Sequence, residues 1–105
     1  MASGSDDKRH SRRVAYPCEA RYSDGAEDWQ TVRLSDISVE GAFVDTMIEL
    51  PVGTKLRLTF DLDGTRIAVM TEVAHCMPQF GMGVRFSNLT PEALSAIEKR
   101  VQGEA

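Results

Sequence analysis

The stretch from Lys55 to Leu62 alternates polar and apolar side chains at every residue. Leu56, Leu58 and Phe60 take apolar positions, and charged or hydroxyl-bearing residues stand between them. A period of two places successive side chains on opposite faces of a strand. The alternation therefore predicts a β-strand with one face in the core and the other in water.

A tight turn follows this strand. Asp63 and Gly64 both accept positive φ, which favours a hairpin into a second strand from Arg66 to His75. The residues expected to face the core from this second strand are Ile67, Val69 and Val73.

Four further segments rich in Val, Ile, Leu, Phe and Thr are bounded by Gly, Pro, Asn or Asp. They are Ala15 to Tyr22, Trp29 to Ile37, Ala42 to Thr46 and Met82 to Phe86. With the hairpin they make six strands, at spacings typical of a small antiparallel barrel. The sequence thus predicts a mainly β fold.

A helix is expected at the C-terminal end, over about residues 90–102. Thr90 supplies an N-cap, Pro91 suits the first helical position, and Gly103 ends the helix. The apolar stripe expected to pack on the barrel is Leu94, Ile97 and Val101.

The length of 105 residues suits one domain. We expect residues 1–13 to be a flexible basic arm and residues 14–105 to form the barrel with its helix. The basic residues of the arm are Lys8, Arg9, Arg12 and Arg13. Without these four, eight basic side chains face 16 acidic ones. An acidic body with a basic arm favours a small anionic ligand over DNA or RNA.

Several classes of protein do not match this sequence. No apolar run is long enough to span a bilayer, and the N-terminus lacks the apolar core of a signal peptide, so we expect a cytoplasmic protein without membrane insertion. Cys18 and Cys76 lack the spacing of a zinc or redox pair. No set of residues has the spacing of a catalytic site, so we expect no enzyme, metal or cofactor.

Two short motifs carry most of the functional information. Arg9 and Arg13 form RxxxR directly before the first strand, and Asp36-Ile37-Ser38-Val39-Glu40-Gly41 reads DxSxxG between two later strands. Strand alternation would place Asp36 and Ser38 on the same side, while Gly41 permits a left-handed turn or a close approach of ligand. The alternative for each motif is structural: a solvated basic tail, and a turn whose side chains bond the backbone.

Together the two motifs resemble the signature of the PilZ family. The stretch LPVGTKLRLTF is similar to the family's glycine-containing turn into a hydrophobic strand, GMGVRF is similar to its closing strand, and the terminal helix falls in the family position. The resemblance implies a six-stranded antiparallel barrel with a C-terminal helix. It also implies that cyclic di-GMP binds on the outer surface, where the N-terminal arm folds across it.

The chemistry of the motifs suits that ligand. Arginine forks can bridge phosphate oxygens or pair with guanine O6 and N7, which gives Arg9 and Arg13 suitable targets. The guanine N1 and N2 donors suit Asp36 and Ser38 as acceptors, and Gly41 leaves room for the base. Adenine reverses this pattern, so the motifs predict a preference for guanine.

Three residues near the motifs have open roles. Lys8 stands where some PilZ proteins carry a further arginine and bind two intercalated ligand molecules, and lysine lacks the planar fork that stacks on a base. His75 falls where related domains can place an aromatic group beside the base, although a lone histidine is also an ordinary surface residue. Arg12 either attracts phosphate or faces solvent.

The resulting hypothesis is a cyclic di-GMP receptor or adaptor whose arm changes conformation on binding and thereby regulates a bacterial partner. The alternative is a PilZ-like protein-interaction domain that does not bind the messenger. The sequence leaves open the downstream partner and its pathway, a stoichiometry of one or two ligands, and whether the chain is a monomer or a weak dimer.

Overall fold

The computed structural model describes residues 12–25 and 28–103. The elements are β1 (Val14–Ser23), β2 (Gln30–Ile37), β3 (Gly41–Asp45), β4 (Lys55–Leu62), β5 (Thr65–Met77), β6 (Gly81–Ser87) and α2 (Pro91–Gly103). The mainly β prediction is therefore confirmed, and every predicted strand has its counterpart. The division into an arm and a barrel stays a prediction, although β1 begins at Val14, where the arm was expected to end.

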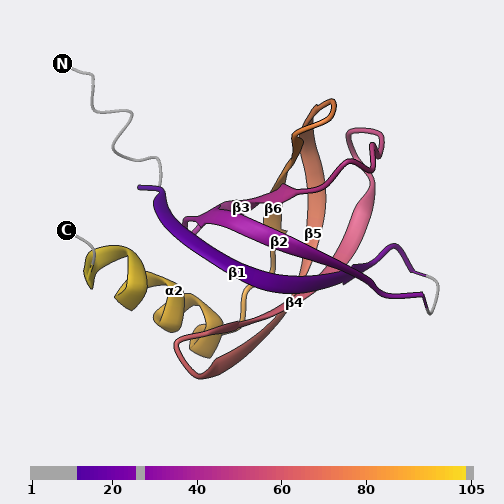
Figure 1. Cartoon of the computed structure of the whole chain (residues 1–105). Helices are drawn as coiled ribbons and strands as arrows, with labels where there is room; N and C mark the ends of the chain where they lie inside the picture. The colour runs from indigo at the N-terminus through magenta and orange to yellow at the C-terminus, as the bar shows by residue number, and fades with distance from the viewer. Residues whose placement is uncertain (1–11, 26–27, 104–105) are drawn as a thin grey trace, which may run out of the picture.

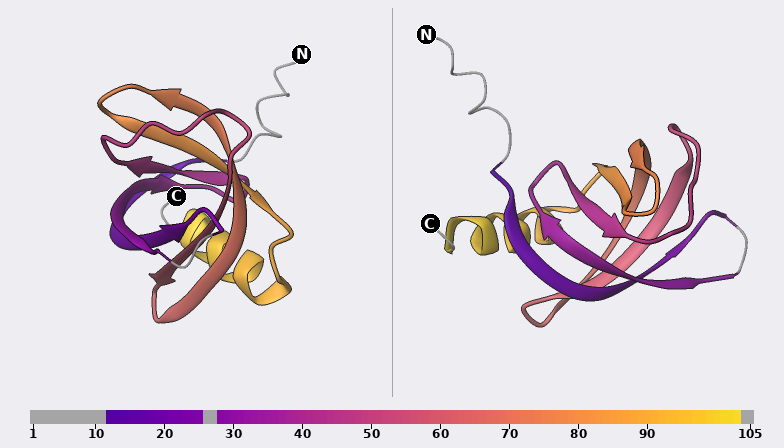
Figure 2. Two further views of the ribbon diagram at one scale, coloured as in Figure 1. Left: turned by 90° about the vertical axis from the view of Figure 1, so that its right-hand side faces the viewer. Right: turned by 45° about the horizontal axis from the view of Figure 1, so that its top comes forward.

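The strands form a closed barrel in the order β1-β2-β3-β6-β5-β4. All neighbouring strands are antiparallel, and the barrel closes where β1 pairs with β4 as well as with β2. The helix α2 lies at one end of the barrel, close to the start of β1 (Figures 1 and 2). Within the described residues, no helix is long and apolar enough to cross a membrane.

The alternating strand behaves as its pattern predicts. Leu56, Leu58 and Phe60 of β4 are at most 3% exposed and lie in the barrel core. The three core residues expected from β5 are buried too. Thr71, also buried, occupies a core position of β5 because its hydroxyl donates a hydrogen bond to the Leu56 carbonyl at 3.1 Å.

The turn between β4 and β5 has the predicted conformation. Asp63 has φ of 50° and Gly64 has φ of 90°, and the strands pair directly on either side of them, at Leu62 and Thr65. Positive φ at both central residues is the mark of a type I′ turn, which matches the twist of a hairpin.

The helix begins as expected, but its packing face is shifted. The Thr90 hydroxyl accepts a hydrogen bond from the Ala93 amide at 3.1 Å, which confirms the N-cap. The buried residues of α2 are Ala93, Ile97 and Val101. The prediction that Leu94 packs on the barrel is wrong, since this side chain is 37% exposed. Ala93, four residues before Ile97, takes that place, and its neighbour Leu94 is turned about 100° away around the helix.

A cluster of polar contacts fastens the last turn of α2 to the barrel. The Arg100 guanidinium donates to both carboxylate oxygens of Asp63, at 2.6 and 3.1 Å, and lies 4.9 Å from the centre of the Tyr16 ring. The Tyr16 hydroxyl accepts from the Asp63 amide at 3.0 Å and donates to the Asp61 carbonyl at 3.3 Å. The helix, the β4–β5 turn and β1 therefore meet at one point.

This cluster predicts a specific pH dependence. The hydrogen bond from Arg100 holds the pKa of the Asp63 carboxyl below its ordinary value of 3.8. Because the pKa is lowered in the folded state, the stabilising contribution is present above the unfolded-state pKa and is lost as pH falls through the folded-state pKa. We expect an NMR titration to show a lowered Asp63 pKa that returns to its ordinary value in Arg100→Gln. Identical Asp63 titration curves in the two proteins would contradict the assignment.

Candidate functional site

A hollow of about 300 Å³ lies on the outer surface of the barrel. Its lining comes from the residue before β1, the β2–β3 turn and strands β3, β5 and β6: Arg13, Ser38, Glu40, Gly41, Ala74, His75, Gly83, Val84 and Arg85. These segments meet because β6 pairs with both β3 and β5, while the start of β1 pairs with the end of β2. The hollow therefore contains residues from both sequence motifs.

Arg13 and Asp36 form an ion pair at the edge of the hollow. Pairing of Ala15 with Asp36 brings the end of β2 beside the start of β1, and Arg13 Nη1 donates to Asp36 Oδ1 at 3.0 Å. The two side chains are 45% and 32% exposed, so water screens their attraction and the pair is easily rearranged. Asp36 does not itself line the hollow and is joined to it through Arg13.

Ser38 shapes the turn between β2 and β3. Ser38 directly follows the end of β2 at Ile37, lines the hollow and is only 3% exposed. Its hydroxyl oxygen accepts hydrogen bonds from the amides of Glu40 and Gly41, at 3.1 and 3.2 Å. In this structure the hydroxyl bonds the turn backbone, which is the structural alternative that the sequence left open.

Gly41 is required by the contact between two strands. A Cβ atom at this position would collide with the carbonyl oxygen of Val84 in β6. The residue does not have positive φ, so of the two uses expected for this glycine the left-handed turn is not adopted, and the close approach of a ligand stays a prediction. What Gly41 permits is the close approach of β3 to β6, and this approach forms the floor of the hollow.

His75 lies over a strand position that has no side chain. Gly83 of β6 pairs with His75 of β5 on one side and with Phe43 of β3 on the other. A Cβ atom on Gly83 would collide with the imidazole ring, which leans over the glycine. The rings of Phe43 and His75 are 6.3 Å apart between centroids and tilted by 35°. The exposed imidazole therefore has a defined position on the wall of the hollow.

Arg85 is the residue that the sequence analysis missed. It lines the hollow, is exposed, and pairs with Gly41 across the β3–β6 register. GMGVRF indicated a strand, and alternation along it places Arg85 on the same face as Gly81 and Gly83. Only the register, however, puts Arg85 next to the glycine of DxSxxG.

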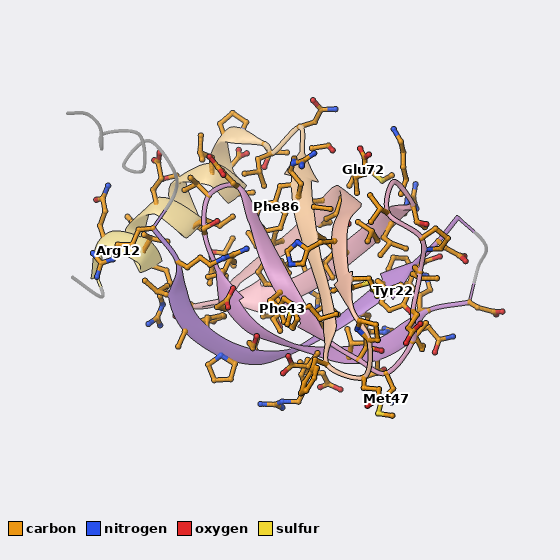
Figure 3. The ribbon with its side chains drawn as sticks, turned by 90° about the horizontal axis from the view of Figure 1, so that it is seen from above. Arg12, Tyr22, Phe43, Met47, Glu72 and Phe86 are labelled. Carbon is orange, nitrogen blue, oxygen red and sulfur yellow. The ribbon has the colours of Figure 1, made fainter. Side chains whose placement is uncertain are left out.

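Among the described residues, Arg12 does not line this hollow. Lys8 and Arg9 lie outside the described residues. Arg12 is exposed and lies at the end of the barrel next to α2, whereas Phe43 lies near the middle (Figure 3). No group of three or more His, Cys, Asp or Glu side chains within residues 12–25 and 28–103 could hold a metal ion.

A larger depression of about 660 Å³ lies between α2 and the β4–β5 turn. Asp63, Glu92 and Lys99 are among its lining residues, but none of the expected ligand-binding residues that the structure describes is. The smaller hollow, where residues of both motifs meet, is therefore the candidate site.

Solved structures with the same fold include domains from several bacteria. The inhibitor of motility from Bacillus subtilis (MotI/DgrA) matches with a TM-score of 0.78 and 18% identity over 91% of this chain, which spans 50% of that protein. The PilZ domain of YcgR from Escherichia coli, solved with cyclic di-GMP, matches with a TM-score of 0.71 and 14% identity over 91% of this chain and 90% of that domain. The PilZ domain of CeSA from a cellulose-synthesizing bacterium matches with a TM-score of 0.68 and 16% identity over 90% of this chain and 98% of that domain.

The TM-scores establish a shared fold, and at such low identities the likeness to these structures extends no further than the fold. A comparison with curated proteins finds no significant match. The sequence profile of the PilZ domain matches residues 7–103, which includes both motifs and nearly the whole chain. The chain therefore belongs to the PilZ domain family, whose members are non-catalytic receptor domains.

Proposed function

We propose that this chain binds cyclic di-GMP at the hollow and acts as a receptor or adaptor that regulates a bacterial partner. The observation that carries this proposal is the contact between the two motifs. Arg13 of RxxxR and Asp36 of DxSxxG are 23 residues apart in sequence and hydrogen-bonded in space. Residues of both motifs thereby flank one depression on the barrel surface.

The arginines supply the charge and planar geometry that the ligand needs. A guanidinium can bind a phosphate through two parallel hydrogen bonds, or guanine through O6 and N7. Among the described residues Arg13 holds Asp36 through Nη1 alone, so its other guanidinium nitrogens can donate to a ligand. Arg9 precedes it by four residues and is proposed to provide the second fork.

Asp36 and the turn after it provide recognition of guanine. Among the described residues, Arg13 engages Oδ1 of Asp36, so Oδ2 can accept from guanine N1–H and N2–H. Ser38 acts by holding the Glu40 and Gly41 amides in place, and direct contact with guanine would require its hydroxyl to exchange a turn hydrogen bond. His75 offers an exposed ring on which a purine can stack.

Regulation is proposed to proceed through residues 1–13, which would close over the bound ligand in the cytoplasm and present a changed surface to a protein partner. The E. coli YcgR domain was solved with cyclic di-GMP, and the B. subtilis neighbour is an inhibitor of motility. Both likenesses support a signalling role. Lys8 keeps a positive charge that suits a second ligand molecule. The number of ligand molecules bound per chain in calorimetry decides between a one-molecule and a two-molecule site.

The proposal predicts micromolar or tighter binding of cyclic di-GMP by isothermal titration calorimetry. Arg9→Ala/Arg13→Ala removes both forks and is expected to abolish binding. The matched control, Arg33→Ala/Arg57→Ala, removes two exposed arginines that do not line the hollow and should bind like the wild type. A folded wild type that binds no ligand would instead favour a PilZ-like domain that recognises only proteins.

The donor and acceptor pattern predicts a preference for guanine. Cyclic di-AMP carries the same phosphates but would leave Asp36 facing an acceptor, and each unpaired buried polar group costs about 1 to 3 kcal/mol. We therefore expect cyclic di-AMP to bind about five- to 150-fold more weakly. Competition titrations against labelled cyclic di-GMP measure this ratio, and equal affinities would refute the proposed contact to Asp36.

The proposed closure predicts a change in residues 1–13 on binding. Backbone amide resonances from this segment should shift at saturating ligand, and their heteronuclear relaxation should change with them. The helix residue Ser95, which lines the other depression, serves as an internal reference. Binding by calorimetry with unchanged resonances from residues 1–13 would rule out the coupled closure while leaving the hollow as the binding site.

A further inference from the structure

Arg85 lines the hollow and has a glycine beside it on one neighbouring strand and a glutamate on the other. On the β3 side it pairs with Gly41, which has no side chain, and on the β5 side it pairs with Glu72. The next outward position along β6 is Gly83, again without a side chain. Arg85 therefore has no β3 side chain beside it at the Gly41 position, while the His75 ring covers Gly83.

Among the described residues that line the hollow, Arg13 and Arg85 are the arginines, and only Arg13 has an ion-pair partner. Arg13 is paired with Asp36, at 3.0 Å. Among the described residues no ion pair joins Arg85 to a carboxylate, although Glu72 is its cross-strand neighbour and Glu40 lines the same hollow. An anion that enters the hollow therefore meets a guanidinium that does not have to release a partner first.

We propose that Arg85 binds a phosphate group of the ligand and is an affinity-determining residue outside the two sequence motifs. This inference rests on the proposed function. A phosphodiester is the chemical group that suits it, because the planar guanidinium donates two parallel hydrogen bonds to two phosphate oxygens. Arg13, directly before β1, and Arg85 of β6 then both contact the ligand, from two segments that line the hollow.

The experiment is calorimetric titration of cyclic di-GMP into the full chain and its Arg85→Ala, Arg85→Gln and Arg85→Lys variants. Arg57→Ala is the matched control, since Arg57 is also an exposed strand arginine but lines a different depression, beside Trp29. Circular dichroism confirms that each variant is folded. Each titration is repeated at several salt concentrations, because a lost phosphate contact lowers the salt dependence of binding.

We expect Arg85→Ala and Arg85→Gln to weaken binding at least tenfold, and Arg85→Lys to recover part of the loss because it keeps the charge without the fork. The slope of log Kd against log salt concentration should fall in the neutral variants, and Arg57→Ala should stay within twofold of the wild type.

Binding by Arg85→Ala within twofold of the wild type, with binding still lost in Arg9→Ala/Arg13→Ala, would overturn the inference and leave the proposed function intact. A weaker Arg85→Ala with an unchanged salt slope would overturn the phosphate assignment. A wild type that does not bind would overturn the proposed function and this inference together.

Discussion

The pairing of β1 with both β2 and β4 is the constraint on which the rest of the structure depends. It closes the sheet into a barrel, and closure fixes where each end of β1 lies. Val14 pairs with Ile37, so Arg13 must lie beside the end of β2 and the turn that follows it. The contact between Arg13 and Asp36 is a direct result of this register.

Closure also decides on which side of the sheet a ligand can bind. The interior of the barrel is filled by apolar side chains such as Leu34, Ile37 and Met82, none of which is exposed to solvent. A barrel of this size holds side chains and leaves no room for a dinucleotide inside. The polar and aromatic groups proposed for recognition consequently stand on the outer face, around Gly41 of β3 and Gly83 of β6.

Sequence reasoning predicted the features that depend on local patterns. Alternation in β4 and the Asp63-Gly64 pair define the hairpin, because strand period and positive φ are properties of adjacent residues. The prediction that Leu94 faces the barrel is wrong because Ala93 fits the same helical periodicity. Only packing against the barrel determines which of the two residues is buried. Of the candidate site, Arg13, Asp36 and Gly41 follow from their motifs, whereas the turn bonds of Ser38 and the position of Arg85 depend on backbone geometry and strand register.

Because His75 packs over Gly83, the residues that can be accepted at positions 75 and 83 depend on each other. A side chain at position 83 and the imidazole at position 75 cannot keep their present positions together, since a Cβ at position 83 would collide with the ring. Substitutions at these sites are therefore expected to arise as compensated pairs in descendants of this domain. While position 83 is glycine, position 75 can accept aromatic rings other than imidazole. If position 83 acquires a side chain, a ring in this place at position 75 is excluded.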